Sequence, residues 1–166
     1  MAAPVVTLRS LAQGDEDELL RIHRTPEVVR WWDEPEATFP WDEPRSTRFV
    51  IEVDGAVAGL IQYWEEDEPK YRHAGIDLFV DPELHGRGVG SRAISKVVEL
   101  LFEQRGHHRI TIDPATENAM AIGAYERAGF KRVGIMRSAE RNADGKGWHD
   151  SLLMELLDTD ARPRPG

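Results

Sequence analysis

Three glycines stand within five residues of the segment His85–Ser91, HGRGVGS. Glycine has no Cβ atom, so a ligand can approach the main chain closely and successive N–H groups can converge on one point. Apolar residues recur at helical spacing from Val89 onward, which places the segment at the start of a helix. Free N–H groups and the positive end of the helix dipole then face the same way, and Arg87 adds a fixed charge. This combination suits a phosphate group.

Two common phosphate-binding loops differ from this segment. The chain contains no G-x-x-x-x-G-K-[ST], and the dinucleotide fingerprint G-x-G-x-x-G would require glycine at Ser91. The segment instead resembles the acyl-CoA loop of the GNAT N-acetyltransferase superfamily, Q/R-x-x-G-x-G/A. His85, Gly88 and Gly90 stand at its three defined positions, and His85 departs from the usual Gln or Arg.

A second segment strengthens this resemblance. ENAMAIGAYERAGF, residues 117–130, resembles the GNAT stretch N-x-x-A-I-x-x-Y-E-K-x-G-F and follows the glycine loop at the distance that the family uses. Within the superfamily the chain is most similar to the aminoglycoside 6′-N-acetyltransferases. The similar segments include VVRWW (28–32), GID (75–77), VELLF (98–102) and ITIDP (110–114). The end of the chain, KGWHDSLLMELL (146–157), instead resembles GNAT enzymes that acetylate protein N-termini.

The resemblance implies acetyl-CoA as the cosubstrate. Its pyrophosphate would lie on the N–H groups of residues 86–90, and its pantetheine arm would pair with the main chain at Phe79 and Val80 as an added strand. The implied cofactor-binding residues are Phe79, Val80, His85, Gly86, Arg87, Gly88, Val89, Gly90, Ser91, Asn118 and Tyr125. No metal is expected, because the six histidines are scattered without H-E-x-x-H spacing.

The implied reaction is attack of a primary amine on the thioester carbonyl. An ammonium group must first lose a proton, and carboxylates can stabilise the cation and pass the proton to water. Asp77 and Asp113 fall where the aminoglycoside enzymes carry aspartate, and Tyr125 matches the general acid that protonates or hydrogen-bonds the departing thiolate. Asp77 could instead be an exposed strand residue, Asp113 a turn residue before Pro114, and Tyr125 a core residue.

Acidic and aromatic side chains gather outside these motifs. DEPEATFPWDEP (33–44) holds five carboxylates, and residues 65–68 are four consecutive acids. These segments are either solvated loops or a surface for a cationic, ring-bearing substrate. Two adjacent tryptophans on one short helix cannot both face the same core, so either one is partly exposed at a binding cleft or both are partly buried packing residues. The predicted substrate-binding residues are Trp31, Trp32, Trp41, Glu65, Glu66, Asp77, Asp113 and Asp150.

The remaining pattern predicts the elements that must position these residues. Predicted strands cover residues 5–8, 47–53, 56–64, 76–80, 109–112, 133–136 and 149–156, and predicted helices cover 15–23, a short segment from Pro26, 89–102 and 119–128. This order, β, α, α, β, β, β, α, β, α, β, β, predicts an α/β (α+β) class. The resemblance implies a GNAT fold, with a mixed, mostly antiparallel central sheet, helices on both faces, and a splay between the central strands for acetyl-CoA.

Length and composition limit the function. The 166 residues predict one domain, 1–157, followed by a flexible C-terminal tail, 158–166. The absence of cysteine excludes disulfides and thiolate metal sites. Thirty acidic against 21 basic residues, a formal charge of −9, disfavour nucleic acid as a partner. No apolar run has membrane-spanning length and no secretory signal is visible, so a cytoplasmic enzyme is expected.

The sequence thus predicts an acetyl-CoA-dependent N-acetyltransferase whose partner is a cationic small-molecule amine. The leading substrate is the 6′-amine of an aminoglycoside, with antibiotic resistance as the role. Alternatives within the class are a peptide or protein N-terminus, a polyamine or a cyclic peptide antibiotic. A non-catalytic acyl-CoA-binding module is the alternative of another class. A homodimer is possible by analogy with the family.

Overall fold

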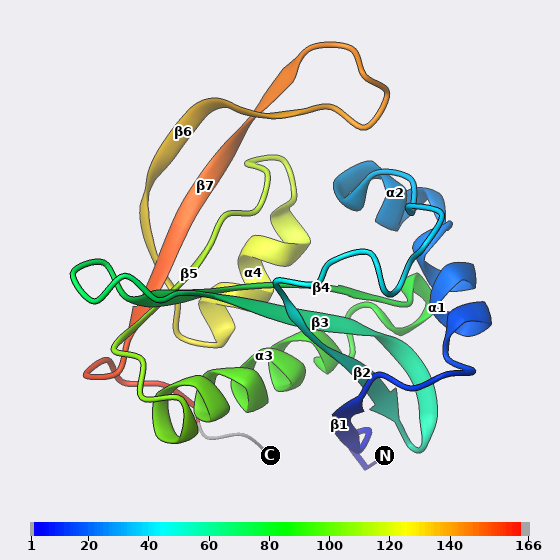
Figure 1. Ribbon diagram of the computed structural model, residues 1–166, viewed down its shortest axis with the longest axis horizontal. Helices are drawn as coiled ribbons and strands as arrows, with labels where there is room; N and C mark the ends of the chain where they lie inside the picture. The colour runs from blue at the N-terminus through cyan, green and yellow to red at the C-terminus, as the bar shows by residue number, and fades with distance from the viewer. Residues whose placement is uncertain (1, 164–166) are drawn as a thin grey trace.

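A computed structural model describes residues 2–163 of the chain. Within them, seven strands form one sheet in the order β1-β2-β3-β4-β5-β7-β6 (Figure 1). The strands are β1 (Val6–Ser10), β2 (Thr47–Val53), β3 (Ala56–Glu66), β4 (His73–Val80), β5 (Arg109–Ile112), β6 (Lys131–Arg141) and β7 (Trp148–Leu157). The helices are α1 (Glu16–His23), α2 (Pro26–Trp32), α3 (Val89–Glu99) and α4 (Ala119–Arg127), with a 3₁₀ turn η1 (Pro82–Leu84) and a π-helical turn η2 (Leu100–Gln104). The predicted order of elements is confirmed.

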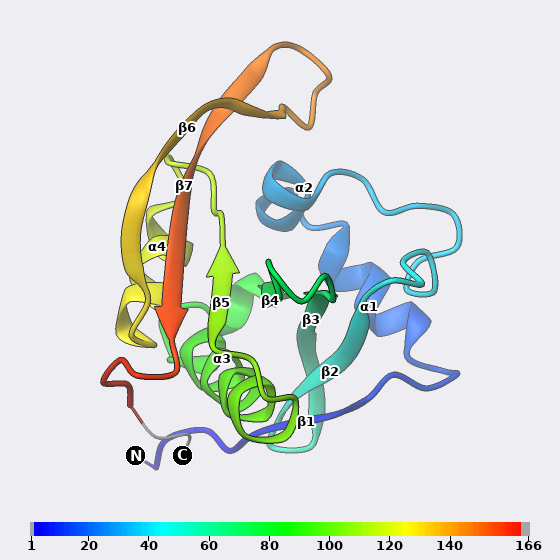
Figure 2. The ribbon, with the colours of Figure 1, turned by 60° about the vertical axis from the view of Figure 1, so that its left-hand side comes forward.

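The sheet is mixed, because one of its pairings is parallel. Every neighbouring pair is antiparallel except β4 and β5. These two strands pair only at Ala74 with Ile110 and at Gly75 with Thr111, although β4 continues to Val80. Beyond Gly75 the two strands diverge (Figure 2). The predicted splay between the central strands therefore lies between β4 and β5.

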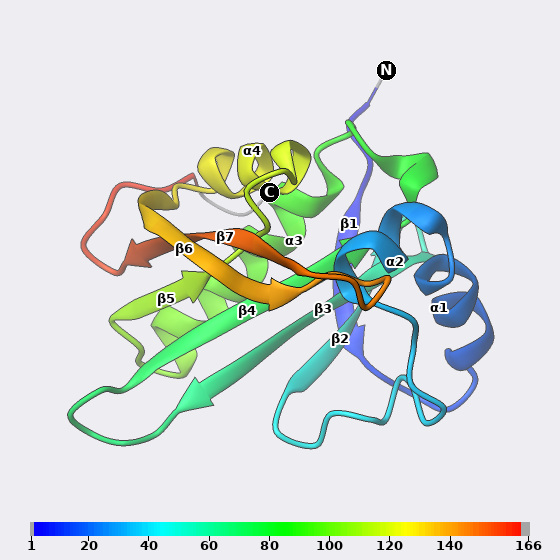
Figure 3. The same ribbon diagram turned by 90° about the horizontal axis from the view of Figure 1, so that it is seen from above.

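Helices cover both faces of the sheet because strand residues alternate between two buried clusters. Leu60 packs in a cluster with Leu19 of α1, whereas its neighbour Ile61 belongs to a second cluster that contains Ile94 of α3. Helices α1 and α2 thus lie on one face and α3 and α4 on the other (Figure 3). Both clusters contain apolar residues of the central strands. Their burial supplies the main favourable free energy of folding, at roughly 25 cal/mol for each Å² of apolar surface removed from water.

The β6–β7 hairpin extends further than the sequence predicts. The predicted strand at 133–136 is part of β6, which runs from Lys131 to Arg141. Its side chains are almost all exposed, and its register with β7 shifts twice, so it shows no apolar alternation. The tip of the hairpin bends toward α2 (Figures 1 and 2).

The described part of the predicted tail, residues 158–163, packs against the domain. The Asp160 carboxylate accepts hydrogen bonds from Lys131 Nζ at 2.9 Å and from the Leu157 N–H at 3.0 Å. The Arg162 guanidinium lies 4.8 Å from the centre of the Phe102 ring. Residues 164–166 of the predicted tail lie outside the described residues. None of the helices within residues 2–163 has the length and apolar character needed to cross a membrane.

Candidate active site

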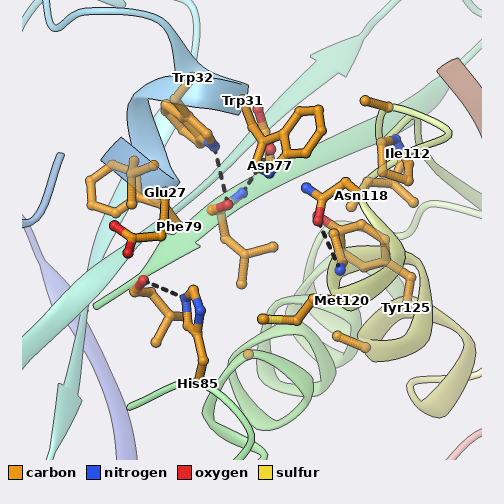
Figure 4. A pocket seen from close by; sticks show the side chains of 18 of the residues that line it. Glu27, Trp31, Trp32, Asp77, Phe79, His85, Ile112, Asn118, Met120 and Tyr125 are labelled. Atoms are coloured by element: carbon orange, nitrogen blue, oxygen red, sulfur yellow. Dashed lines mark hydrogen bonds between the residues drawn. The ribbon is translucent and has the colours of Figure 1, made fainter. Parts of the chain in front are cut away.

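A cavity of about 920 Å³ lies where β4 and β5 diverge. Its walls come from α2, β4, the glycine loop with the start of α3, the segment after β5, α4 and the β6–β7 hairpin. Figure 4 shows Trp31 and Asp77 at one end of this cavity and His85 at the other. The cavity therefore brings the two predicted motifs together with residues from four further segments.

The glycine loop forms the end of the cavity that a phosphate group would occupy. Gly86 and Gly88 have φ angles of 79° and 75°, in the left-handed region that favours glycine. Gly88 is the N-cap of α3, and Gly86, Gly88 and Gly90 all line the cavity. The free N–H groups of the first helical turn therefore open toward it. The Arg87 side chain is not among the lining groups.

The His85 side chain ties this loop to β4. Its Nε2 lies 2.9 Å from the main-chain oxygen of Val80. A carbonyl oxygen can only accept, so Nε2 carries a proton and donates it. The histidine that replaces the usual Gln or Arg thus anchors the loop to the strand that it follows.

The main chain of β4 presents alternate residues to the cavity. The Leu78 N–H donates to Asp77 Oδ1 at 2.9 Å, and the Leu78 oxygen accepts from Trp32 Nε1 at 3.1 Å. The Phe79 carbonyl faces β3, where a Cβ added at Gly59 would clash with it. Because the direction of these groups alternates along a strand, Leu78 and Val80 face the cavity and Phe79 does not. The predicted pantetheine pairing is therefore corrected at Phe79, although the Phe79 ring lines the cavity.

Two predicted carboxylates, Asp77 on β4 and Asp113 directly after β5, line the same cavity. Both residues are exposed to solvent there, but protein packed around each carboxylate disfavours its charged form. This loss of hydration around the carboxylate raises the pKa of Asp77 to about 7, and the nearby Asp113 and Glu140 add to this rise. The same loss of hydration raises the pKa of Asp113. A carboxylate with a pKa near neutrality can take a proton from an ammonium group and release it again.

Tyr125 of α4 also lines the cavity and is only 3% exposed. Burial raises its pKa well above the usual value, and the nearby Asp77 and Asp113 add to the rise. The phenol therefore stays protonated at neutral pH and can donate a proton or a hydrogen bond. Asn118, which the family resemblance assigns to cofactor binding, is the N-cap of α4, because its side chain accepts a hydrogen bond from the Ala121 N–H at 3.2 Å. Such a cap contributes about 1 kcal/mol to stability.

Two further cavity residues, Glu140 and His149, were missed by the sequence reasoning. They are Cα partners across the β6–β7 hairpin, with Glu140 Oε2 and His149 Nε2 3.5 Å apart. Burial raises the pKa of Glu140, Asp113 and Asp33 add to the rise, and His149 opposes it. The predicted strands, 133–136 and 149–156, left Glu140 in a connecting turn, so its partner was not apparent.

Four predicted substrate-binding residues lie outside this cavity. Trp41 is half exposed and donates its indole N–H to Glu16 at 3.1 Å. Glu65 pairs with Arg105 at 2.7 Å, and Glu66 accepts from the main chain of residue 68. The Asp150 carboxylate accepts from the Ser138 N–H at 2.8 Å. Trp31 and Trp32 do line the cavity, as do the predicted residues Val89 and Ser91.

A cavity at a splay in the sheet, with a glycine loop at one end that suits phosphate groups, is the arrangement of a coenzyme A-dependent acyltransferase. Residues 16–130 match the sequence model of the Acetyltransferase (GNAT) family, and the chain belongs to this family. It is an N-acetyltransferase with acetyl-CoA as its acetyl donor. The cavity fits this donor, because its glycine loop leaves the main chain accessible at the start of α3.

Relatives and solved structures agree with this assignment. The chain is 28% identical over 159 residues to an aminoglycoside N(6′)-acetyltransferase type 1 of Klebsiella pneumoniae, with 81% of this chain and 78% of the relative covered. It is 28% identical over 143 residues to a spermidine N(1)-acetyltransferase of Escherichia coli strain K12, covering 80% and 76%. The structure of Mycobacterium smegmatis RimJ in complex with CoA-disulfide superposes with a TM-score of 0.80 at 24% identity, covering 94% of this chain and 83% of RimJ. The last likeness shows the GNAT fold.

The described residues contain no group of three or more His, Cys, Asp or Glu side chains placed to hold a metal ion.

Proposed function

We propose that this protein transfers the acetyl group of acetyl-CoA to a primary amine of a polycationic small molecule, with the 6′-amine of an aminoglycoside as the substrate. One observation carries the proposal. Asp77 and Asp113, two carboxylates with raised pKa values, line the cavity beside the Trp31 ring and across from the glycine loop. Carboxylates and aromatic faces together suit a cationic, ring-bearing amine.

The acetyl donor occupies the end of the cavity near α3. The N–H groups of residues 86–90 hold its pyrophosphate, and Arg87 contributes charge from outside the cavity wall. The pantetheine arm runs along β4 and meets the main chain of Val80, whose oxygen also accepts from His85. The thioester then lies between Asp77 and Tyr125, which line the cavity from β4 and α4.

The chemistry proceeds by direct attack. Asp77 and Asp113 hold the ammonium group, and Asp77 accepts one proton from it, because a pKa of about 7 allows this at neutral pH. The neutral amine attacks the thioester carbonyl, a C–N bond forms and the C–S bond breaks. Tyr125 gives its proton to the departing thiolate and regains one from water. The second proton of the reacting nitrogen leaves through the carboxylates to solvent.

The choice of amine rests on the relatives. The Klebsiella pneumoniae relative is named for the aminoglycoside 6′ position, and the Escherichia coli relative for spermidine N(1). Both names describe polycationic amines, which fits an acidic cavity. A polyamine is therefore the second candidate substrate, since the two relatives share the same identity of 28%.

The experiment measures thiol release from acetyl-CoA with kanamycin, an aminoglycoside with a 6′-hydroxyl, spermidine, a cyclic peptide antibiotic and a short peptide with a free N-terminus. We expect turnover with kanamycin and none with the 6′-hydroxyl compound. Turnover with spermidine alone would replace the aminoglycoside with a polyamine. Turnover with a peptide alone would contradict the polycationic small molecule. Coenzyme A binding without any turnover would support a non-catalytic module instead.

A further inference from the structure

His85 stands where the family carries glutamine or arginine, and its charge, unlike theirs, can change near neutral pH. We infer that His85 takes up a proton when coenzyme A binds and that its Nδ1 then donates a hydrogen bond to the pyrophosphate. The affinity of the protein for its acetyl donor is therefore expected to rise as the pH falls. The inference rests on the proposed function, because that function places the pyrophosphate on the glycine loop.

The His85 ring is held at the phosphate end of the cavity. His85 lines the cavity together with Gly86 and Gly88, at the end opposite Asp77 (Figure 4). Its Nε2 donates to the Val80 oxygen at 2.9 Å, which holds the ring between the end of β4 and the loop. Nδ1 is the ring nitrogen closer to the main chain of His85 and therefore to the loop. Within residues 2–163 this Nδ1 has no hydrogen-bond partner.

The protonation state of Nδ1 decides whether His85 can bind a phosphate group. When the ring is neutral, Nε2 carries the hydrogen and Nδ1 is an acceptor. The oxygens of an ionised pyrophosphate also only accept hydrogen bonds, so the neutral ring offers them no bond. A proton on Nδ1 makes it a donor and adds a positive charge, while the bond from Nε2 to Val80 stays in place. The charged ring therefore binds the pyrophosphate more tightly, and binding draws a proton from solvent.

The charged side chains on the neighbouring elements leave His85 without a carboxylate partner. His85 forms no ion pair with any residue from 2 to 163. Asp81, at the end of β4, pairs instead with Arg21 of α1 at 2.7 Å, and Glu27 of α2 lines the same cavity. The other charged residues on adjacent elements are Glu83 of η1, Arg87 of the loop and Arg92 of α3. The pyrophosphate thus supplies the negative charge that favours the protonated ring.

Calorimetry counts the proton directly. The ligand is 3′-dephospho-coenzyme A, because it keeps the pyrophosphate but lacks the phosphate monoester, which itself titrates near neutral pH. Each titration is made at about pH 7 in two buffers that differ in their enthalpy of ionisation, so the difference in heat measures proton uptake. We expect the unaltered protein to take up roughly half a proton more than His85→Gln. Protons moved by other groups in the cavity are common to both proteins and cancel in this difference.

The affinity for the same ligand as a function of pH gives a second measurement. Between about pH 8.5 and about pH 6, we expect the affinity of the unaltered protein to rise about five- to tenfold more than that of His85→Gln. His85→Arg carries a fixed charge and is expected to show the weak pH dependence of His85→Gln. His108→Gln is the control, because His108 is exposed and lies outside the cavity. It is expected to behave as the unaltered protein does.

Equal proton uptake by the unaltered protein and His85→Gln, or affinities that change equally with pH, would overturn the inference. A His85→Arg variant that keeps the pH dependence of the unaltered protein would overturn it too, because that dependence would belong to another group. Failure of the proposed function is a separate result, because it would appear as no thiol release from acetyl-CoA with any amine, whatever the binding measurements give.

Discussion

The indole Nε1 of Trp32 donates a hydrogen bond to the main-chain oxygen of Leu78, 3.1 Å away. This bond joins α2 to β4 at the point where β4 has parted from β5. The Trp32 ring also lies perpendicular to the ring of Phe79, 5.0 Å between centroids, and edge-on to His23 at 5.9 Å. The wall that carries Trp31 is therefore fixed to the strand that carries Asp77.

Substitutions at Gly88 test whether the glycine loop binds the pyrophosphate of acetyl-CoA. Gly88→Asp and Gly88→Asn impose the same left-handed backbone strain at φ 75° and add side chains of the same size. We expect the aspartate to weaken acetyl-CoA binding about 100-fold more than the asparagine, because it adds negative charge beside the pyrophosphate. Calorimetric titration measures both. Equal losses would show that strain alone matters and would remove the charge argument.

A substitution at Tyr125 tests whether its hydroxyl protonates the departing thiolate. Tyr125→Phe keeps the buried ring next to Phe130, at 6.1 Å between centroids, and removes only the hydroxyl. We expect kcat to fall about 10- to 100-fold while the affinity for acetyl-CoA changes less than about twofold. Steady-state kinetics and a binding titration separate these effects. A variant with full kcat would exclude Tyr125 from the chemistry.

Asp77 gives the reaction a predictable pH dependence. Its pKa is about 7, so the carboxylate that accepts a proton becomes populated as the pH rises through neutrality. We expect kcat/KM to rise through about pH 7 and Asp77→Asn to lose both this rise and most of the activity. Asn keeps an oxygen for the Leu78 N–H. A pH profile unchanged in Asp77→Asn would assign the proton to another group.

The Asp77 carboxyl also makes stability depend on pH, but stability falls as the pH rises whereas activity increases. Its pKa is higher in the folded protein than the ordinary value of 3.8, so the folded state binds the proton more tightly than the unfolded chain. Stability is lost as the pH rises from 3.8 to about 7. The Tm of Asp77→Asn should therefore exceed that of the unaltered protein increasingly over this window and remain higher above it.

We expect the protein to lose stability in acid because the buried His23 resists protonation. It is 3% exposed, its Nε2 donates to the Asp33 oxygen at 3.0 Å, and burial lowers its pKa below the ordinary value of 6.5. The unfolded chain therefore binds a proton that the folded protein resists, and stability falls as the pH drops below 6.5. Denaturant unfolding at about pH 7.5 and about pH 5 measures the loss. His23→Gln should reduce the loss, whereas the exposed His108→Gln should leave it unchanged.

The sequence predicted the parts of the site that local patterns determine. The glycine loop before α3 depends on a few neighbouring residues, as do the start of α4 after Asn118 and the turn at Asp113 after β5. Asp77 and Asp113 meet because β4 and β5 are neighbours, which the order of elements and the family resemblance together implied.

The parts that could not be predicted depend on long-range pairing. The predicted strands 47–53 and 56–64 are present and pair with each other, but β3 continues to Glu66 and pairs with β4 so that Glu65 lies opposite Ala74. Glu65 is therefore at the start of β4 and away from the glycine loop. Glu140 stands on an exposed edge strand with a shifted register, where no alternation marks the inward side. The direction of the Phe79 carbonyl depends on the register with β3, which short-range pattern does not determine.

Only two residue pairs join β4 to β5, and they connect β1–β4 with β5, β7 and β6. The backbone pairing of the sheet is therefore sparse between β4 and β5, and a ligand that lies along the splay adds contacts to both strands. A ligand present at 100 times its dissociation constant stabilises the folded state by about 2.7 kcal/mol. We expect coenzyme A to protect the chain from proteolysis, so that the supply of coenzyme A in a cell governs how long each molecule survives as well as how fast it works.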